Sequence, residues 1–291
     1  MTMRLRAPAK INLDLRVGPR RADGYHDIST VFQTLALHDV VHVTPRPGSV
    51  VVTTDDPSIP GGAGNLCAKA IEALWKTTGR PGQPTGYAVH VEKRIPAEAG
   101  LGGGSSDAAA VIVAMSREWG LALDDVRVHA AAALVGADVP FFLIGGTVLG
   151  VGRGDRLTPL ADRPAAEVVL VQPPFGLSTA EVYRRFDEVD AAARAWAGGG
   201  AVVTVSACRN DLERAAAALR PEILALAAWL RRLGAHQAAM TGSGSVVFGT
   251  FASAAAADRA ADAVAGGGRR VVRTATIDRA TCARWREESA G

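Results

Sequence analysis

The sequence lacks any run of about 18 uninterrupted apolar residues, the length that a membrane-spanning helix requires. Its first residues also lack the apolar core of a signal peptide, so neither a membrane protein nor an exported one is expected. Cysteine is scarce, because Cys67, Cys208 and Cys282 are the three in the chain and they form no metal-like pattern. Their odd number and wide spacing disfavour disulfides and zinc, and we expect a cytoplasmic location.

Long basic runs are missing as well, although the formal net charge is +3. The basic residues are scattered, and no run is longer than a pair such as Arg20-Arg21. With 5 tryptophans and 3 tyrosines there is also little material for stacking on bases, so nucleic acid is not expected as a partner. A mildly basic balance instead suits an enzyme for anionic, phosphorylated small molecules. We expect the protein to act as a monomer or weak homodimer.

Periodicity predicts an α+β protein with two domains. The 291 residues, 48 % of them apolar and 21 % charged, suffice for one large or two ordinary folded domains. In the first half we expect strands over 11–17, 31–35, 40–44, 50–53, 87–91, 141–142 and 146–151, and helices over 66–77, 108–119 and 124–135. The proline-bounded segment 159–164 is a plausible boundary.

In the second half the expected order is strand (167–171), helices (179–186, 211–219, 221–233), strand-loop-strand (235–251), helix (253–264) and strand (270–277). This order fits a split βαβ, ferredoxin-like domain. The sequence therefore predicts a domain over residues 1–160, with a mixed sheet and helices, and a second over 161–291, with the active site in the cleft between them. Gly198-Gly199-Gly200 is expected to be a surface loop.

The most informative stretch is Gly100–Asp107, Gly-Leu-Gly-Gly-Gly-Ser-Ser-Asp, which stands between an expected strand and an Ala-rich expected helix. Its glycines permit positive φ and close approach of a ligand to the backbone. The two serines and the aspartate predict a capped helix N-terminus, whose free N–H groups and positive dipole end suit a phosphate. The stretch has neither a Walker Gly-Lys-Ser/Thr nor the third glycine of a dinucleotide fold. A flexible linker with a helix cap is the alternative.

Three further segments carry candidate site residues. Lys10 and Asn12 are two apart on an expected strand, so both side chains point to one face while Ile11 and Leu13 face the core. A solvent-exposed strand face is the alternative. Asp138 stands among small and apolar residues, where a partly buried carboxylate needs a partner, although a helix C-cap and turn would also account for it.

Two turns complete the set. Tyr25 and His26 follow an Asp-Gly turn and could stack on and hydrogen-bond a planar base, although such a pair is usually structural. Gly242 and Ser243 belong to a second glycine loop, Met240–Ser245, between two expected strands, where a bare hairpin is the alternative.

Together these motifs resemble a known superfamily. Pro96 and the glycine stretch match P-x-x-x-G-L-G-x-S-S, the phosphate loop of the galactokinase, homoserine kinase, mevalonate kinase and phosphomevalonate kinase (GHMP) superfamily. The extra glycine, and Pro-Ala-Lys-Ile-Asn-Leu over 8–13, are similar to one branch, the 4-diphosphocytidyl-2-C-methyl-D-erythritol kinases. The resemblance covers nearly the whole chain, with four motifs in the family's order.

The resemblance implies an ATP-dependent kinase, with Mg²⁺ on the ATP phosphates, that phosphorylates the 2-hydroxyl of 4-diphosphocytidyl-2-C-methyl-D-erythritol in the non-mevalonate isoprenoid pathway. It implies that Asp138 is the general base and Lys10 its catalytic partner. It implies a substrate site of Asn12, Tyr25, His26, Tyr183, Gly242 and Ser243, with the cytosine between the two tyrosines and read by the histidine. The implied ATP site comprises Asn65, Pro96, Gly100, Leu101, Gly102, Gly103, Gly104, Ser105 and Ser106.

Two residues depart from the family's pattern. Glu98 puts a negative charge in the approach to the glycine stretch where a small residue is common, and Asp14 follows Leu13 where a hydrophobic residue is usual. Another kinase of the superfamily, for homoserine or mevalonate, is the nearer alternative function, but those substrates carry no base for Tyr25 and His26. A nucleotide-binding regulatory module without activity is the more distant one, and intact Lys10 and Asp138 disfavour it.

Overall fold

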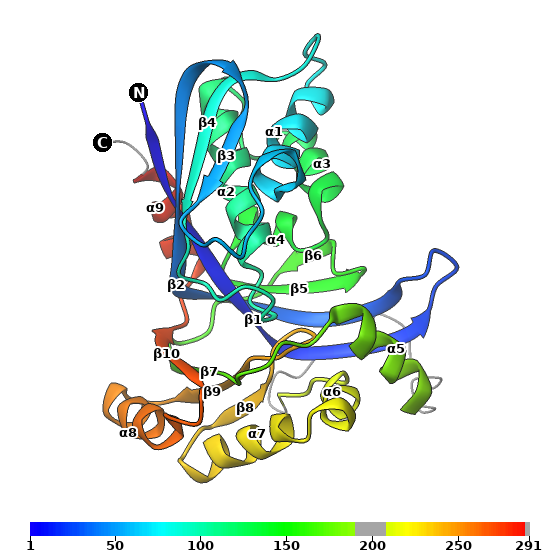
Figure 1. The fold of residues 1–291 in the computed structure, drawn as a ribbon, viewed down its shortest axis with the longest axis vertical. Coiled ribbons are helices and arrows are strands. Elements are labelled where there is room, and N and C mark those ends of the chain that lie inside the picture. Colours follow the sequence, from blue (N-terminus) through cyan, green and yellow to red (C-terminus); the bar gives the residue numbers. More distant parts are fainter. Residues whose placement is uncertain (190–207, 289–291) are drawn as a thin grey trace.

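Two β-sheets, each covered by helices, form the protein (Figure 1), whose computed structural model describes residues 1–189 and 208–288. The expected loop at 198–200 lies outside the described residues. The first sheet has the order β3-β4-β2-β5-β6, with β1 pairing β2. Its strands are β1 (Met3–Arg20), β2 (His26–Ser49), β3 (Val51–Thr54), β4 (Thr85–Glu92), β5 (Thr147–Gly152) and β6 (Arg156–Pro159). Because β3 runs parallel to β4 and the other pairs are antiparallel, the sheet is mixed, as predicted.

The first two strands are much longer than the sequence suggested. The separate short strands expected over 11–17, 31–35 and 40–44 are parts of the continuous β1 and β2, so that prediction was wrong in its boundaries. The pairing of β1 with β2 shifts register between Pro8 and Lys10 and again between Asn12 and Asp14. Such bulges bend a strand and break the period-two pattern without ending the strand, which explains why the pattern was read as several pieces.

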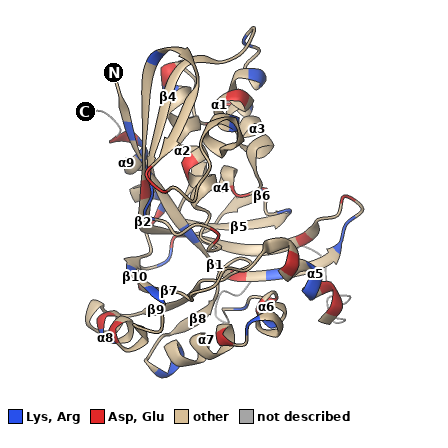
Figure 2. Ribbon diagram, in the orientation of Figure 1, with Lys and Arg blue, Asp and Glu red and all other residues tan. Residues whose placement is uncertain are grey.

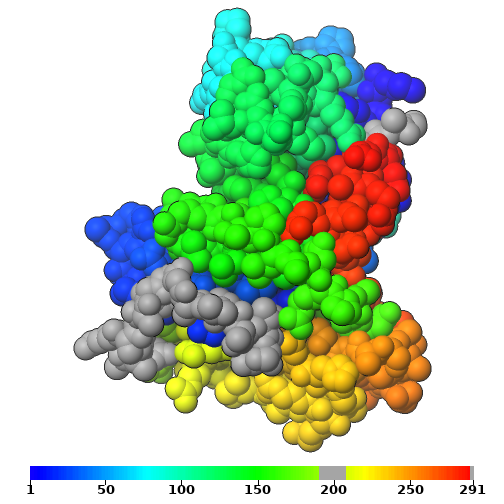
Figure 3. Space-filling model, turned by 180° about the vertical axis from the view of Figure 1, so that it is seen from behind, coloured from blue at the N-terminus to red at the C-terminus, as the bar shows by residue number. Residues whose placement is uncertain are grey.

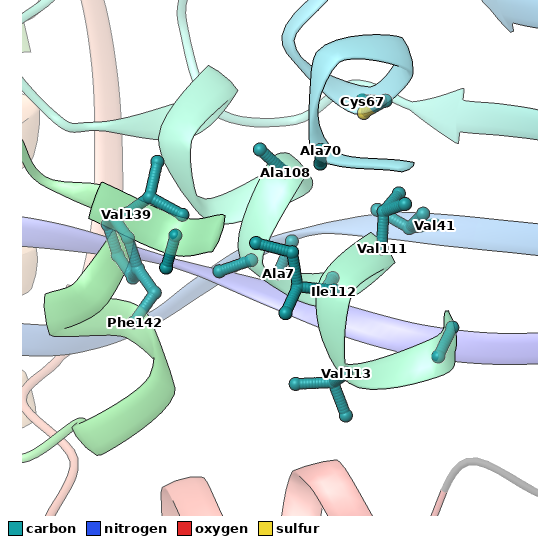
Figure 4. Packing of buried hydrophobic residues seen from close by; sticks show 14 of the residues in the cluster. Ala7, Val41, Cys67, Ala70, Ala108, Val111, Ile112, Val113, Val139 and Phe142 are labelled. Atoms are coloured by element: carbon teal, nitrogen blue, oxygen red, sulfur yellow. The ribbon is translucent and has the colours of Figure 1, made fainter. Parts of the chain in front are cut away.

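Helices η1 (Gly62–Gly64), α1 (Leu66–Thr77), α2 (Gly103–Glu118), α3 (Val126–Val135) and α4 (Val139–Ile144) belong to this half. Figure 4 shows α2 at the centre of the packing, with Ala108, Val111 and Ile112 between α1, α4 and the strands β1 and β2. The helix expected over 66–77 is confirmed, and the Asn65 side chain caps it by accepting from the Cys67 N–H.

Two local predictions in this half were wrong. Residues 141–142 form part of helix α4 rather than a strand, since Pro140 in the first turn favours a helix start and a short apolar run alone does not distinguish the two. Helix α2 begins at Gly103, not at residue 108, because Gly102 takes a left-handed conformation (φ 72°) and ends the loop there. Ser105, Ser106 and Asp107 consequently lie inside the helix instead of capping it.

The second sheet has the antiparallel order β10-β7-β9-β8 and confirms the split βαβ prediction. It comprises β7 (Glu167–Gln172), β8 (Gln237–Met240), β9 (Val247–Phe251) and β10 (Arg270–Ala275), with helices α5 (Thr179–Val189), α6 (Glu213–Leu219), α7 (Glu222–Arg232) and α8 (Ala254–Val264). Along β7, Val169 and Val171 join the core under the helices, whereas Val168 and Leu170 join a third core shared with β1 and β2. This third core fixes the two sheets against each other.

The chain leaves the first sheet after β6 and returns to it at its end. The predicted division at residue 160/161 falls between β6 and β7, but helix α9 (Arg279–Glu287), which the sequence reading did not anticipate, packs back on β1. Figure 3 shows this C-terminal segment, in red, lying against the upper half of the molecule. The division into 1–160 and 161–291 therefore stays a prediction.

Charged residues are spread over both halves (Figure 2). Among the described residues, no helix has both the length and the apolar character needed to cross a membrane.

Candidate active site

A buried lysine and a half-buried aspartate meet where β1 approaches the start of α4. The Lys10 Nζ lies 3.6 Å from Asp138 Oδ2, and the side chains are 5 % and 33 % exposed. Asp138 occupies the N-cap position of α4 but makes no capping hydrogen bond, so its carboxylate remains directed to the lysine. A buried ammonium is stabilised by such a pairing, and a carboxylate held beside it can accept a proton from a third group.

Asn12 connects this pair to the second glycine loop. Its Oδ1 accepts from Lys10 Nζ at 2.8 Å and from the Gly242 N–H at 3.0 Å. Its Nδ2 donates to Thr30 Oγ1 at 2.7 Å, and its backbone N–H donates to Thr241 Oγ1 at 3.1 Å. The exposed-face alternative for Lys10 and Asn12 is thereby excluded, since both are buried. The amide of Asn12 is engaged with protein partners, so it positions Lys10 and the loop.

The two glycine loops pack directly on each other. A Cβ at Gly100 (φ +73°) would lie 2.2 Å from the Thr241 carbonyl oxygen, so no larger residue fits there. Gly102 is also enclosed, because its Cβ would lie 2.9 Å from Phe142 Cζ and 3.2 Å from Lys10 Cγ. No side chain caps the helix that begins at Gly103, which leaves its first N–H groups for a ligand. The linker alternative for this stretch is excluded by its packing.

Two cavities adjoin at these loops. The first, about 520 Å³, is lined by Lys10, Asn12, Asp138, Tyr183, Gly242 and Ser243 among others, and we call it the acceptor cavity. The second, about 750 Å³, is lined by Asn65, Pro96, Gly100, Leu101, Gly102, Gly103, Gly104 and Ser105 among others, and we call it the nucleotide cavity. Glu98, Gly100, Gly102 and Thr179 line both. The acceptor cavity lies in the cleft between the halves, because residues of β1, α5 and the second glycine loop contribute together with Asp138 at the start of α4.

Ser106 is the one predicted ATP-site residue that does not line the nucleotide cavity. Its side chain is buried and faces a small cavity of about 20 Å³ between α2 and α9. Its Oγ has no hydrogen-bond partner among the described residues. The continuation of α2 through residue 106 explains this, since successive helical side chains point about 100° apart.

Tyr25, His26 and Tyr183, the residues expected to bind a base, make contacts with other side chains in this structure. The His26 and Tyr183 rings stack with centroids 5.0 Å apart, and His26 Nε2 lies 2.8 Å from Asp187 Oδ1. Tyr25 is 55 % exposed, and the Arg153 guanidinium lies 4.2 Å from its ring centroid. Tyr183 and Arg153 line the acceptor cavity. The structure thus stacks Tyr183 on His26, whereas the Tyr25 ring lies against the Arg153 guanidinium.

The negative charge of Asp138 also affects Tyr183. Burial and the negative charge of Asp138 raise the pKa of Tyr183 to about 12. Its hydroxyl is therefore protonated at neutral pH and is available as a hydrogen-bond donor on the wall of the acceptor cavity.

A buried ionic cluster beneath the nucleotide cavity was missed by the sequence reading. Lys93 Nζ donates to Asp107 Oδ2 at 2.7 Å and also to Asp39. Burial raises the pKa of Asp107 to about 7, against the opposing effect of Lys93. The signal available was the aspartate that follows Ser-Ser, which we assigned to a helix cap. Lys93 stands 14 positions from Asp107 and Asp39 stands 68 positions from it, and Lys93 bridges the two carboxylates. No local pattern could therefore identify this cluster.

Asn210, Thr179 and Ser243 hold the second glycine loop at the cleft. Asn210 Nδ2 donates to the carbonyl oxygens of Met240 and Gly242 at 2.7 and 2.8 Å. The hydroxyls of Thr179 and Ser243 are 2.8 Å apart. Ser243 thereby connects α5 to the loop, so the bare-hairpin alternative does not describe this segment.

The side chains at these cavities suit a Mg²⁺ ion that is held mainly by the phosphates of a bound nucleotide. The described residues contain no group of three or more His, Cys, Asp or Glu that could hold a metal ion by itself. Oxygen donors are nevertheless present, since Glu98 and Asp138 line the acceptor cavity and Ser105 and Thr179 line the nucleotide cavity. Mg²⁺ in nucleotide sites keeps several waters and takes one or two carboxylates plus phosphates, which fits this donor set.

Known proteins match this chain over most of its length. Residues 65–146 match the model of the GHMP kinases N-terminal domain, and residues 188–269 match that of the GHMP kinases C-terminal domain. A 4-diphosphocytidyl-2-C-methyl-D-erythritol kinase of Nocardioides sp. is 40 % identical over 92 % of this chain and 95 % of its own length. The enzyme of the same name from Pelotomaculum thermopropionicum is 40 % identical over 84 % of this chain and 88 % of its own.

Solved structures extend the likeness to the fold. The crystal structure of a 4-(cytidine 5'-diphospho)-2C-methyl-D-erythritol kinase matches with a TM-score of 0.74 and 35 % identity, covering 94 % of this chain and 99 % of that one. A mevalonate kinase matches with a TM-score of 0.68 at 14 % identity, covering 96 % of this chain and 99 % of that one. The second likeness concerns the fold alone.

Proposed function

The chain belongs to the family of 4-diphosphocytidyl-2-C-methyl-D-erythritol kinases within the GHMP kinases, and from that premise we propose that Lys10 and Asp138 carry out its chemistry. The protein is an ATP-dependent kinase that phosphorylates 4-diphosphocytidyl-2-C-methyl-D-erythritol in isoprenoid biosynthesis. A homoserine or mevalonate kinase is not favoured, since structures with those names match at 17 and 14 % identity.

The 3.6 Å pair of Lys10 and Asp138 on the wall of the acceptor cavity is the observation that carries the proposal. Asp138 accepts the proton of the substrate's 2-hydroxyl as that oxygen attacks the γ-phosphorus. The new O–P bond forms while the bond from the γ-phosphorus to the bridging oxygen breaks, and ADP leaves. Lys10, whose Nζ lies 3.6 Å from Asp138 Oδ2, orients that carboxylate and stabilises the negative charge that develops on the attacking oxygen.

The nucleotide cavity holds ATP with its phosphates at the N-terminus of α2. The uncapped N–H groups after Gly102 and the positive end of the helix dipole supply the phosphate site. Asn65 lies farther along the same cavity, where it would contact the adenosine. Mg²⁺ on the phosphates, with oxygen ligands from the carboxylates and hydroxyls named above, would neutralise part of the transferred charge.

Gly102→Ala should weaken ATP binding on the order of tenfold, because the new methyl group would press on Phe142 and Lys10 and displace the start of α2. Gly120→Ala is a matched control, since Gly120 has a similar φ of +67° at the other end of α2 but nothing within 4 Å of its Cβ position. Calorimetric titration of both variants with ATP measures the effect. Equal ATP affinity in the two variants would return the loop to a purely structural role.

The cytidine portion of the substrate binds at the Tyr183 side of the acceptor cavity. One face of the Tyr183 ring stacks on His26, whose Nε2 is engaged with Asp187, and Tyr183 also lines the cavity. Tyr25 and Arg153 flank the same region and would close over the base on binding. Base stacking on an aromatic side chain is worth about 1–3 kcal/mol in nucleic-acid complexes.

A coupled kinase assay with a panel of acceptors tests this assignment. The cytidine diphosphate ester should be accepted, its uridine analogue poorly and methylerythritol phosphate hardly at all, because unpaired groups in the site penalise the analogues. Tyr25→Ala and Tyr183→Ala should raise the KM for the cytidine ester about tenfold and leave the KM for ATP nearly unchanged. Efficient turnover of homoserine or mevalonate, without preference for the cytidine ester, would contradict the substrate assignment.

We propose further that the protein acts in the cytoplasm as a monomer or weak homodimer whose partner is this small molecule rather than nucleic acid or membrane. The thiols of Cys67, Cys208 and Cys282 are all free, which supports a reducing compartment.

A further inference from the structure

Glu98 occupies the place where the two cavities meet. It lines both the acceptor cavity and the nucleotide cavity, and its side chain is exposed. Its backbone is left-handed (φ 51°), which is uncommon for a residue other than glycine. Its Oε2 lies 3.9 Å from the position that a Cβ on Gly176 would occupy, so the side chain reaches toward the opposite wall of the cleft.

Glu98 is the unpaired carboxylate of the site. Asp138, which shares the acceptor cavity, lies 3.6 Å from Lys10, and Asp107, which shares the nucleotide cavity, accepts from Lys93 at 2.7 Å. Within the part of the chain that the structure describes, Glu98 has no hydrogen-bond or ion-pair partner. Each of the other two carboxylates has a lysine ammonium beside it, whereas no cationic side chain of the described residues pairs with Glu98.

That charge has a consequence for any triphosphate at the start of α2. Glu98 lines the nucleotide cavity together with Gly102 and Gly103, so phosphates bound at the start of α2 share this cavity with its carboxylate. Negative groups that share one cavity repel each other unless a cation lies between them. Mg²⁺ is a suitable cation, since in nucleotide sites it binds phosphate oxygens together with one or two carboxylates and retains several waters.

We propose that Glu98 binds the Mg²⁺ of MgATP, directly or through a metal-bound water, and thereby makes the site select the magnesium complex over free ATP. The inference rests on the proposed nucleotide site and adds a residue to it. Thr179 lines both cavities beside Glu98, and its hydroxyl supplies a further oxygen at the same junction. Binding of Mg²⁺ would explain why this chain has a glutamate at position 98, where a small residue is common in the family.

The test is the ratio of two dissociation constants, for ATP with a chelator and for ATP with saturating Mg²⁺, measured by calorimetry on the full chain. Glu98→Gln should weaken MgATP binding and strengthen free ATP binding, so that the preference for MgATP falls on the order of tenfold. Glu98→Asp should retain part of the preference, because it keeps the charge. The side chain of Glu98 makes no hydrogen bond, so these variants should fold, which circular dichroism checks.

Glu118→Gln is the matched control, with the same loss of charge at an exposed position at the other end of α2. It should leave both constants unchanged. If Glu98→Gln binds nucleotide with the wild-type preference for MgATP, the inference is wrong while the nucleotide site stands. If the wild-type protein binds neither form of ATP, the proposed nucleotide site itself fails, and the role of Glu98 with it.

Discussion

Asp138→Asn should lower turnover by roughly 10²–10⁴ and leave the dissociation constant of ATP almost unchanged. The amide keeps the size of the carboxylate but does not accept the proton of the acceptor hydroxyl. Asp138 lines the acceptor cavity and is absent from the lining of the nucleotide cavity, which is why ATP binding should persist. Steady-state kinetics with the cytidine ester, together with calorimetry for ATP, separate the two effects.

The control for this variant is Asp124→Asn, an exposed aspartate just before α3, which should keep wild-type turnover. Near-normal turnover would exclude Asp138 as the general base.

The sequence predicts the parts of this fold that local patterns control. Helix α1 begins and ends where apolar spacing and Asn65 indicated, because the Asn65 side chain caps it and its apolar face packs on α2. The order of elements after residue 167 was sufficient for the split βαβ domain, since strands joined by helices in this order follow few topologies.

Tertiary packing decides the parts that the sequence reading missed. Phe141 and Phe142 are fully or almost fully buried, and a short buried apolar run suits a helix or a strand equally well until its neighbours are known. Helix α9 carries a recognisable cap, since Asp278 accepts from the Thr281 N–H, but its polar sequence gave little apolar periodicity. Its place on β1 results from contacts with residues at the other end of the chain.

The candidate site likewise contains residues that local motifs predict and residues that only tertiary packing brings together. Lys10, Asp138 and the glycine loops belong to the first group, because they lie in short motifs of characteristic residue types. Thr30 and Thr241, which hold Asn12, are ordinary threonines until β1, β2 and the second glycine loop come together. Asp187 was likewise invisible, because its contact with His26 spans 161 positions and depends on how α5 packs. Supporting residues of this kind require the structure.

Lys10→Arg should lower turnover by roughly 10²–10³, although it retains the positive charge. The guanidinium is larger and planar, and the space around Lys10 is closed by Phe32, Gly102 and Asn12. An arginine there would shift away from Asp138 or push on the phosphate loop, so the charge would no longer lie beside the attacking oxygen. Lys69→Arg, at an exposed position on α1, is the control and should be silent.

Lys10→Met and the double variant with Asp138→Asn then test whether the two residues act as a unit. Each single variant removes half of the pair that deprotonates and stabilises the acceptor oxygen, so the double variant should be scarcely slower than the slower single one. Thermal denaturation of each variant checks that loss of the buried ammonium has not unfolded the protein. Multiplicative losses in the double variant, or a Lys10→Arg enzyme with wild-type turnover, would show that Lys10 contributes charge independently of its geometry beside Asp138.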